Sequence, residues 1–127
     1  KRYHLEPATL EASEAEAGSL SQSEHQLISA VRDMYLQRIR VLCTDCGYCL
    51  PCPEGVAIPS VFDLYNDGVA YSTAAVARRF YSGLMRRGAD ASRCIACGAC
   101  LPKCPQAIEI IDQLAQAHRF LTEDEKS

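Results

Sequence analysis

Apolar residues recur at helical spacing in four segments of the chain. The first segment covers residues 21–40, where Ser21 followed by Glu24 has the pattern of a capping box at a helix start. This helix is expected to lead directly into Cys43. Its apolar positions recur every three or four residues, and they are Leu27, Ile28, Val31, Met34, Tyr35 and Ile39.

Three more helices are expected beyond residue 58. The second begins at Pro59 and Ser60 and ends around residues 66–68. The third has Ser72 as its N-cap and ends near Gly88, and its apolar positions are Ala75, Val76, Phe80 and Leu84. The last starts at Pro105, because proline suits a first helical turn, and one of its faces carries Ile108, Ile111, Leu114 and Ala115.

The remaining segments contain no sustained alternation of β-branched and polar residues. A short turn beginning at Asp90 or Ser92 precedes Cys94. The pattern therefore predicts an all-α fold with loops around the cysteines. We expect a helical domain over residues 21–121, a lead-in rich in Ala, Glu and Ser over 1–20, and a polar tail over 122–127.

The composition limits the size of the core and the kinds of partner. Of the 127 residues 48% are apolar, but eight of these are cysteines, so bulky core residues are few and a cross-link is expected to add stability. The net charge of −3 gives no reason to expect nucleic-acid binding. No stretch has the length of a membrane span, and the N-terminus lacks the apolar core of a signal peptide. A cytoplasmic, reducing compartment is therefore expected, within a processed or longer protein because residue 1 is not methionine.

The eight cysteines fall into two copies of one motif. The first copy is CTDCGYCLPCP over residues 43–53, and the second is CIACGACLPKCP over residues 94–105. Both copies read C-x-x-C-G-x-C, then Leu-Pro, then Cys-Pro, and no cysteine lies outside them.

Three chemistries compete for these thiols. Disulfides are disfavoured because nothing indicates secretion and thiols three residues apart make poor bridges. Zinc is disfavoured because its tetrahedral sites usually combine two separated C-x2–4-C pairs. A pair of [4Fe–4S] clusters is favoured, because the C-x2-C-x2-C-x3-C-P run is typical of two-cluster ferredoxins, in which the fourth cysteine ligates the other cluster.

This precedent predicts crossed ligation. The first cluster takes Cys43, Cys46, Cys49 and Cys104, and the second takes Cys94, Cys97, Cys100 and Cys52. The prolines that follow the fourth cysteines turn these thiolates away from their own triplets. The first copy has only two residues before Cys52, and this shorter spacing leaves open the alternative that Cys52 stays near its own loop.

Other residues near the motifs have weaker signals. Gly47 and Gly98 are expected to adopt positive φ, either to bring N–H groups to the cluster sulfurs or only to allow a tight turn. Shielding of the clusters or ordinary core packing is expected of Ile58, Ile95 and Ile108. Surface positions are expected for the histidines, since eight thiolates leave no vacancy for His4, His25 or His118.

A run of arginines spans residues 78–93, with Lys103 beyond it. A solvated helical face is the favoured interpretation, because charge patterning alone is a weak signal. The alternative is that these residues offset the charge of the clusters and help to dock an acidic electron partner.

The spacer and the two cysteine stretches each resemble a known iron–sulfur domain. The helical spacer between the motifs resembles α-helical ferredoxins, which are domains of larger redox enzymes such as the iron–sulfur subunit of succinate dehydrogenase. CTDCGYCLPCPEGVAIPSVFDLYN, with ASRCIACGACLPKCPQAIEIIDQL, is similar to the C-terminal iron–sulfur extension of a subset of bacterial aldo/keto reductase-family proteins. The resemblance implies a module that exchanges electrons with a redox partner protein or an attached reductase. The (β/α)8 barrel of that reductase cannot fit within 127 residues, so its catalytic residues have no counterpart here.

The leading hypothesis is an electron-transfer domain with two [4Fe–4S] clusters and no substrate-turnover residues of its own. A structural iron–sulfur interaction domain and a stand-alone ferredoxin are the alternatives.

Overall fold

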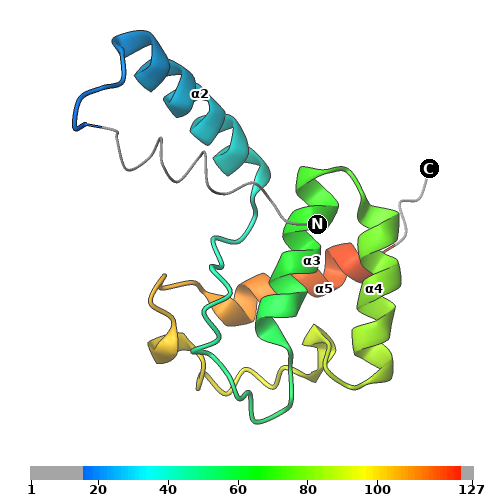
Figure 1. The fold of residues 1–127 in the computed structure, drawn as a ribbon. Helices are drawn as coiled ribbons and strands as arrows, with labels where there is room; N and C mark the ends of the chain where they lie inside the picture. The colour runs from blue at the N-terminus through cyan, green and yellow to red at the C-terminus, as the bar shows by residue number, and fades with distance from the viewer. Residues whose placement is uncertain (1–15, 124–127) are drawn as a thin grey trace, which may run out of the picture. The chain divides into compact units, whose positions relative to one another are not determined.

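The computed structural model describes residues 16–123 and contains α-helices and short 3-10 turns, with no strand in that range (Figure 1). The all-α prediction is confirmed. The elements are α2 (Gln22–Arg38), α3 (Ile58–Ala70), α4 (Ala74–Arg86), η1 (Ala91–Arg93), η2 (Leu101–Lys103) and α5 (Ile110–Thr122). The chain divides into two compact units, Lys1–Met34 and Tyr35–Ser127. Among the helices of residues 16–123, none is long and apolar enough to cross a membrane.

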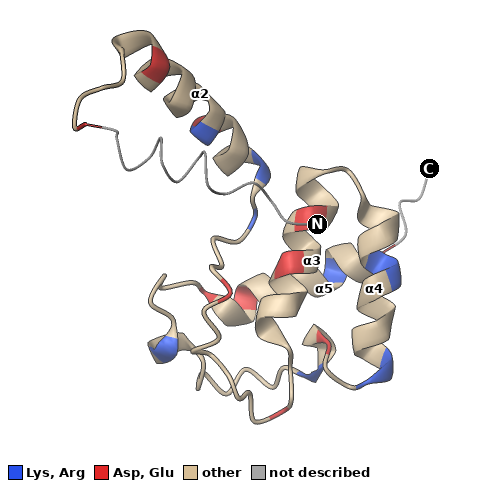
Figure 2. Ribbon diagram, in the orientation of Figure 1, with Lys and Arg blue, Asp and Glu red and all other residues tan. Residues whose placement is uncertain are grey.

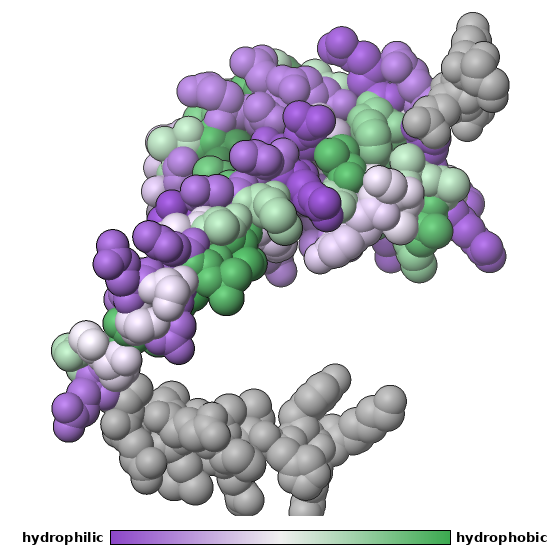
Figure 3. Space-filling model, turned by 90° about the horizontal axis from the view of Figure 1, so that it is seen from above, coloured by the Kyte–Doolittle hydropathy of each residue, from purple (hydrophilic) through white to green (hydrophobic). Residues whose placement is uncertain are grey.

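The capping box predicted at the start of α2 is present. The Ser21 N–H donates to Glu24 Oε2 at 2.7 Å, and the Glu24 N–H donates to Ser21 Oγ at 3.3 Å. The hydrogen bonds from Ser21 lower the pKa of Glu24. No residue of α2 is buried, and the helix ends at Arg38. Figure 3 shows hydrophobic residues at the surface among hydrophilic ones. The exposed large hydrophobic residues of α2 are Leu27, Ile28, Val31, Met34, Tyr35 and Leu36.

The core of the second unit lies between α3, α4 and α5. Each of these helices contacts the other two. The buried residues that they contribute are Ile58, Val61, Phe62, Tyr65, Ala77, Tyr81, Leu84, Ile110, Leu114, Ala117 and Leu121. Gly68 lets α3 approach its neighbours closely, since a Cβ there would lie 2.8 Å from Phe120 Cε1 and 3.1 Å from Ala77 Cβ.

The predicted apolar face of α4 is wrong in part. Val76 and Phe80 are 53% and 64% exposed, whereas Ala77, Tyr81 and Leu84 are buried. The N-cap is also one residue later than predicted, at Thr73, because Ser72 has φ of 54°. Apolar residues occupy both sides of this helix, so spacing alone did not identify the side that packs against α3 and α5.

The last helix begins later than the sequence pattern predicted. It starts at Ile110 rather than Pro105, and Ala115 is exposed although the predicted face included it. The segment after Cys104 forms a turn instead, in which the Ala107 N–H donates to the Cys104 carbonyl at 3.1 Å and Ala107 has φ of 50°. The positive φ interrupts right-handed helix, so α5 starts only after this turn. The second helix agrees more closely with the prediction, since it begins at Ile58 and runs to Ala70.

Candidate metal centres

The two cysteine triplets have the same backbone fold. Asp45 and Ala96 occupy equivalent positions and have φ of 53° and 55°. Gly47 and Gly98 are also equivalent, with the expected positive φ, at 74° and 76°. The residue three positions after each glycine donates its N–H to that glycine's carbonyl, at 2.9 Å in the first copy and 3.1 Å in the second. Alternating right- and left-handed residues form concave nests of N–H groups, which are typical of sites for anions and Fe–S clusters.

The likeness between the two copies extends beyond the fourth cysteine. The N–H of Gly55 donates to the Cys52 carbonyl at 2.9 Å, which matches the turn formed by Ala107 and Cys104 in the second copy. Both α3 and α5 begin six positions after the fourth cysteine. The copies differ between the third and fourth cysteines, where the first has a cis peptide bond before Pro51 and the second forms η2.

One cavity combines the first triplet with the last cysteine of the chain. It has an empty volume of about 330 Å³ and is lined by Cys43, Cys46, Cys49 and Cys104. Aliphatic and aromatic side chains complete its wall, and these include Ile58, Phe62, Ile108 and Ile110. A cysteine from the second motif therefore lies at the cavity of the first triplet.

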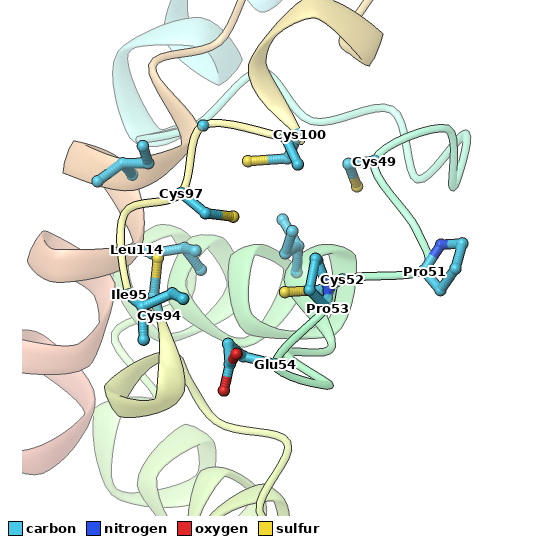
Figure 4. Close-up of a pocket in the computed structure, with 14 residues that line it drawn as sticks. Cys49, Pro51, Cys52, Pro53, Glu54, Cys94, Ile95, Cys97, Cys100 and Leu114 are labelled. Carbon is cyan, nitrogen blue, oxygen red and sulfur yellow. The ribbon is translucent and has the colours of Figure 1, made fainter.

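A second cavity has the reciprocal arrangement. Its empty volume is about 380 Å³, and its cysteines are Cys52, Cys94, Cys97 and Cys100, with Cys49 also on its wall. Figure 4 shows the sulfurs of the first four of these cysteines directed toward a common space. Apolar side chains again line the cavity, and they include Ile58, Ile95, Ile111 and Leu114. Cys49 and Ile58 line both cavities, so only a thin wall separates the two.

Burial and mutual proximity change the acidity of the thiols. Burial raises the pKa of Cys43, and the nearby Cys104 thiolate raises it further. Burial likewise raises the pKa of Cys100, with a further contribution from Cys52. Each pair joins a residue of one motif to a residue of the other. Several thiolates at one cavity repel one another, and bound iron provides the positive charge that compensates.

The chemistry of the donors fits a cluster better than a single ion. Within residues 16–123, no three or more His, Cys, Asp or Glu side chains lie as a group that could hold one metal ion. A [4Fe–4S] cluster instead takes one thiolate at each of four iron corners, which keeps the sulfurs farther apart. All eight cysteines are free thiols, and only Cys46 and Cys97, the second cysteines of the triplets, are exposed. Each apolar cavity therefore has at least the four cysteines that one [4Fe–4S] cluster needs, with Cys49 on the wall of both.

Residues outside the motifs hold the cysteine loops. The side chain of Asn66 in α3 binds the backbone of Val41, two residues before Cys43. The hydroxyl of Tyr81 accepts the Ala91 N–H at 3.0 Å, at the start of the turn that precedes Cys94. The sequence analysis missed both residues. Asn66 binds a backbone that lies 25 positions earlier in the chain, and Tyr81 of α4 binds the backbone of another element, η1.

Asp90 caps the same turn, so the turn begins at the first of the two positions expected from the sequence, Asp90 rather than Ser92. Its Oδ1 accepts the Ser92 N–H at 3.0 Å. Burial acts to raise the pKa of Asp90, but the hydrogen bonds from Ser92, the backbone N–H of Asp90 itself and the nearby His118 together lower the pKa.

The histidines differ in their environments. His25 is exposed, as predicted, and His4 lies outside the described residues. His118 is half-buried and its Nδ1 lies 2.7 Å from the Tyr81 hydroxyl, so the prediction of a plain surface position was wrong for it. Neither cavity wall includes His118.

Comparison with known proteins gives one match. No curated protein and no solved structure matches the chain. Residues 42–109 match the family described as the 4Fe-4S dicluster domain. The matched segment includes all eight cysteines and covers just over half of the 127 residues. Since the two cavities, the duplicated loops and this match agree, the chain belongs to the 4Fe-4S dicluster domain family.

Proposed function

We propose that the chain is an electron-transfer domain with crossed ligation of its two [4Fe–4S] clusters. In this proposal Cys43, Cys46, Cys49 and Cys104 hold the first cluster, and Cys94, Cys97, Cys100 and Cys52 hold the second. One observation carries it: each triplet lines a cavity together with the fourth cysteine of the other motif, and Cys49 lines both cavities. Cys49 is assigned to the first cluster because the other two members of its triplet line the first cavity alone.

The bound clusters supply reversible one-electron redox chemistry. The residues around the clusters control how readily this electron transfer occurs. Ile58 contributes an apolar wall to both cavities, which limits the access of water to the iron ligands. The positive-φ residues of each triplet, Gly47 and Gly98 among them, curve the backbone in the way that would let its N–H groups donate to the sulfurs of a bound cluster. Hydrogen bonds to sulfur and exclusion of water both tune the reduction potential.

A redox titration tests electron transfer. Protein prepared without oxygen should contain the iron and acid-labile sulfide of two cubanes, and dithionite should reduce it reversibly. The visible and electron paramagnetic resonance spectra follow the reduction. Clusters that remain inert to the reductant would favour the structural alternative, in which they only link the helices. Bound zinc without sulfide would contradict the cluster assignment itself.

Two single-cysteine variants test the crossed ligation. Cys104→Ala should disturb the cluster held by Cys43, Cys46 and Cys49 and leave the other intact. Cys52→Ala should have the converse effect. The two reduced clusters can be followed separately by their resonance signals. If each variant instead disturbs the cluster of its own motif, the crossed assignment is wrong.

We further propose that the domain works as part of an aldo/keto reductase-type oxidoreductase and passes electrons to or from that partner. The resemblance of the two cysteine stretches to the iron–sulfur extension of such reductases supports this proposal. The exposed apolar residues of α2 are a further support, because a helix without a buried residue gains stability when a neighbouring domain covers it. Sequencing the gene on both sides of this segment tests it. A (β/α)8 barrel in the same reading frame is expected, and an unrelated product in that frame contradicts the proposal.

A further inference from the structure

The outer face of α4 carries three arginines around an apolar centre. Phe80 is 64% exposed, and Gly83 lies one turn farther along the same face. Arg79, Arg86 and Arg87 are exposed beside them, and these residues line one shallow hollow. The nearest atom to a Cβ placed at Gly83 is the Arg86 guanidinium, at 3.7 Å. We call the surface of Arg79, Phe80, Gly83, Arg86 and Arg87 the α4 face.

The arginines of the α4 face have no carboxylate partner within residues 16–123. Their interactions with the chain are slight, since Arg86 reaches only the Ser82 hydroxyl at 3.4 Å. Arg78, on another side of the helix, shows the contrast. Its Nε donates to the Phe120 carbonyl at 3.2 Å, and its guanidinium lies over the Phe120 ring. Arg78 therefore supports the fold, whereas the arginines of the α4 face make no comparable contact with other residues of the range 16–123.

The charges of the second unit are separated between its helices. Figure 2 shows acidic residues on α3 and basic residues in the middle and at the C-terminal end of α4. Asp63 and Asp67 of α3 line an open cavity beside Cys43, next to the first cysteine site. The α4 face is therefore distinct in charge from the surface beside the first site, and it favours a partner of negative charge.

The segment that follows the α4 face leads toward the second cysteine site. The segment after Arg87 pairs with the loop after Cys52, because the Ala57 N–H donates to the Ala89 carbonyl at 2.9 Å. A few residues later η1 ends at the exposed Arg93, which directly precedes Cys94. Both segments that supply cysteines to the second cavity therefore meet the C-terminal end of α4.

We propose that the α4 face is the docking surface for a protein partner whose own surface presents carboxylates around an apolar side chain. Arginine and exposed aromatic residues are the types enriched at the centres of protein interfaces. A nucleic acid is a poorer occupant, because the chain has a net charge of −3 and thiolate-bound clusters add negative charge. The binding surface itself is argued from the residues of α4. Only the purpose of the binding, which is electron exchange, rests on the proposed function.

A binding measurement with a defined probe tests the surface. The probe is a fluorescent acidic peptide, Glu-Glu-Leu-Glu-Glu-Phe-Glu-Glu, and its isostere has Gln in place of Glu. Fluorescence anisotropy is measured with the oxidised holoprotein at low and high salt. We expect binding of the acidic peptide that weakens at least tenfold in high salt, and no comparable binding of the isostere. No electron moves in this experiment, so its failure contradicts the docking surface and leaves the redox function to its own test.

Matched variants locate the binding. The triple variant Arg79→Gln, Arg86→Gln, Arg87→Gln should lose at least tenfold in affinity and most of the salt dependence. A control removes the same charge elsewhere, through Arg38→Gln, Arg40→Gln and Arg119→Gln, which are all exposed, and it should keep the affinity. Equal losses in the two triple variants would mean a net-charge effect and overturn the proposal. Binding of heparin to the α4 face without binding of the peptide would overturn it as well.

Two single variants keep the test valid if the triple variant does not fold. Arg87→Glu reverses one charge at the end of α4 and should weaken the peptide more than Arg119→Glu does. Phe80→Ser removes the apolar centre and should weaken binding without changing its salt dependence. If neither variant changes the affinity, the α4 face is not the binding site. The cluster absorption and circular dichroism of each variant confirm that it is folded and loaded.

Discussion

Asn66 and Val41 form a closed pair of hydrogen bonds between α3 and the segment that precedes the first cysteine. The Asn66 Nδ2 donates to the Val41 carbonyl at 2.8 Å, and its Oδ1 accepts the Val41 N–H at 3.0 Å. The same Oδ1 accepts the Arg40 N–H at 3.0 Å. Val41 itself is buried. A single amide side chain thus fixes the path of the backbone two residues before Cys43.

Asn66→Ala is expected to destabilise the protein by about 1–3 kcal/mol, because it leaves buried backbone groups of Val41 without partners. The first cysteine site should lose its cluster faster than the second. Denaturant unfolding gives the stability, and the rate of iron release to a chelator gives the cluster loss. Asn66→Asp keeps the acceptor and should cost less. Iron release at the wild-type rate in Asn66→Ala would show that this pair does not position Cys43.

Gly68→Ala is expected to destabilise the protein although alanine is the better helix former. The added Cβ would lie 2.8 Å from Phe120 Cε1 and 3.1 Å from Ala77 Cβ, so the Phe120 ring and α4 must both shift. Phe120 also packs on Tyr65, with 5.3 Å between ring centroids, which limits that shift. Overpacking of this kind typically costs about 1–3 kcal/mol. Denaturant unfolding measures the loss.

Gly83→Ala is the matched control for the same substitution in a neighbouring helix. Only the Arg86 guanidinium lies near the added Cβ, at 3.7 Å, and that side chain can move. The variant should therefore gain up to about 1 kcal/mol from helix propensity. Equal effects of Gly68→Ala and Gly83→Ala would mean that close packing at Gly68 does not determine the outcome.

The sequence predicts the local features of this protein better than the long-range ones. Ser21 and Glu24 form their capping box because both partners lie within one turn. The duplicated motif indicates the cofactor because cluster ligation depends on spacing that is visible in the chain. The positive φ at Ala107, which delays α5, has no comparable signal, since alanine usually favours right-handed helix. The hydrogen bonds of Asn66 with Val41 and of Tyr81 with Ala91 form only because particular helix faces pack together. The spacing of apolar residues in α4 does not indicate which of its faces is packed.

Tyr81→Phe is expected to weaken the turn before Cys94. It removes the acceptor of the buried Ala91 N–H and the contact with His118 Nδ1, so a loss of about 1–3 kcal/mol is expected. The effect should include faster loss of the second cluster, because the Cys94 N–H in turn donates to the Ala91 carbonyl at 3.1 Å. Tyr71→Phe, at a position 65% exposed, is the control and should match the wild type. Equal cluster stability in the two variants would contradict a positioning role for Tyr81.

The pH dependence of stability provides a separate test of Tyr81. Burial raises the pKa of Tyr81 to about 12, whereas a free tyrosine titrates near about 10. The folded state favours the neutral phenol. Tyr81 therefore contributes its full stability below the pKa of a free tyrosine, and this contribution is lost as the pH rises from that pKa toward the raised pKa of the folded state. The wild type should therefore lose more stability in this alkaline window than Tyr81→Phe. Parallel stability curves for the two proteins would show that the phenol is not held neutral by the fold.

Gly98→Val is expected to disturb the second cysteine site, whose cavity Gly98 lines. No other protein atom lies within 4 Å of a Cβ placed at Gly98, so within the protein itself the cost comes from the backbone, whose φ is 76°. A β-branched residue is a strong outlier at positive φ. The free energy of unfolding is therefore expected to fall by about 1–2 kcal/mol. Asparagine tolerates positive φ, so Gly98→Asn should retain the cluster better than Gly98→Val. Reduction potential and iron content measure the effect, and a larger loss in the asparagine variant would mean that something other than φ selects glycine here.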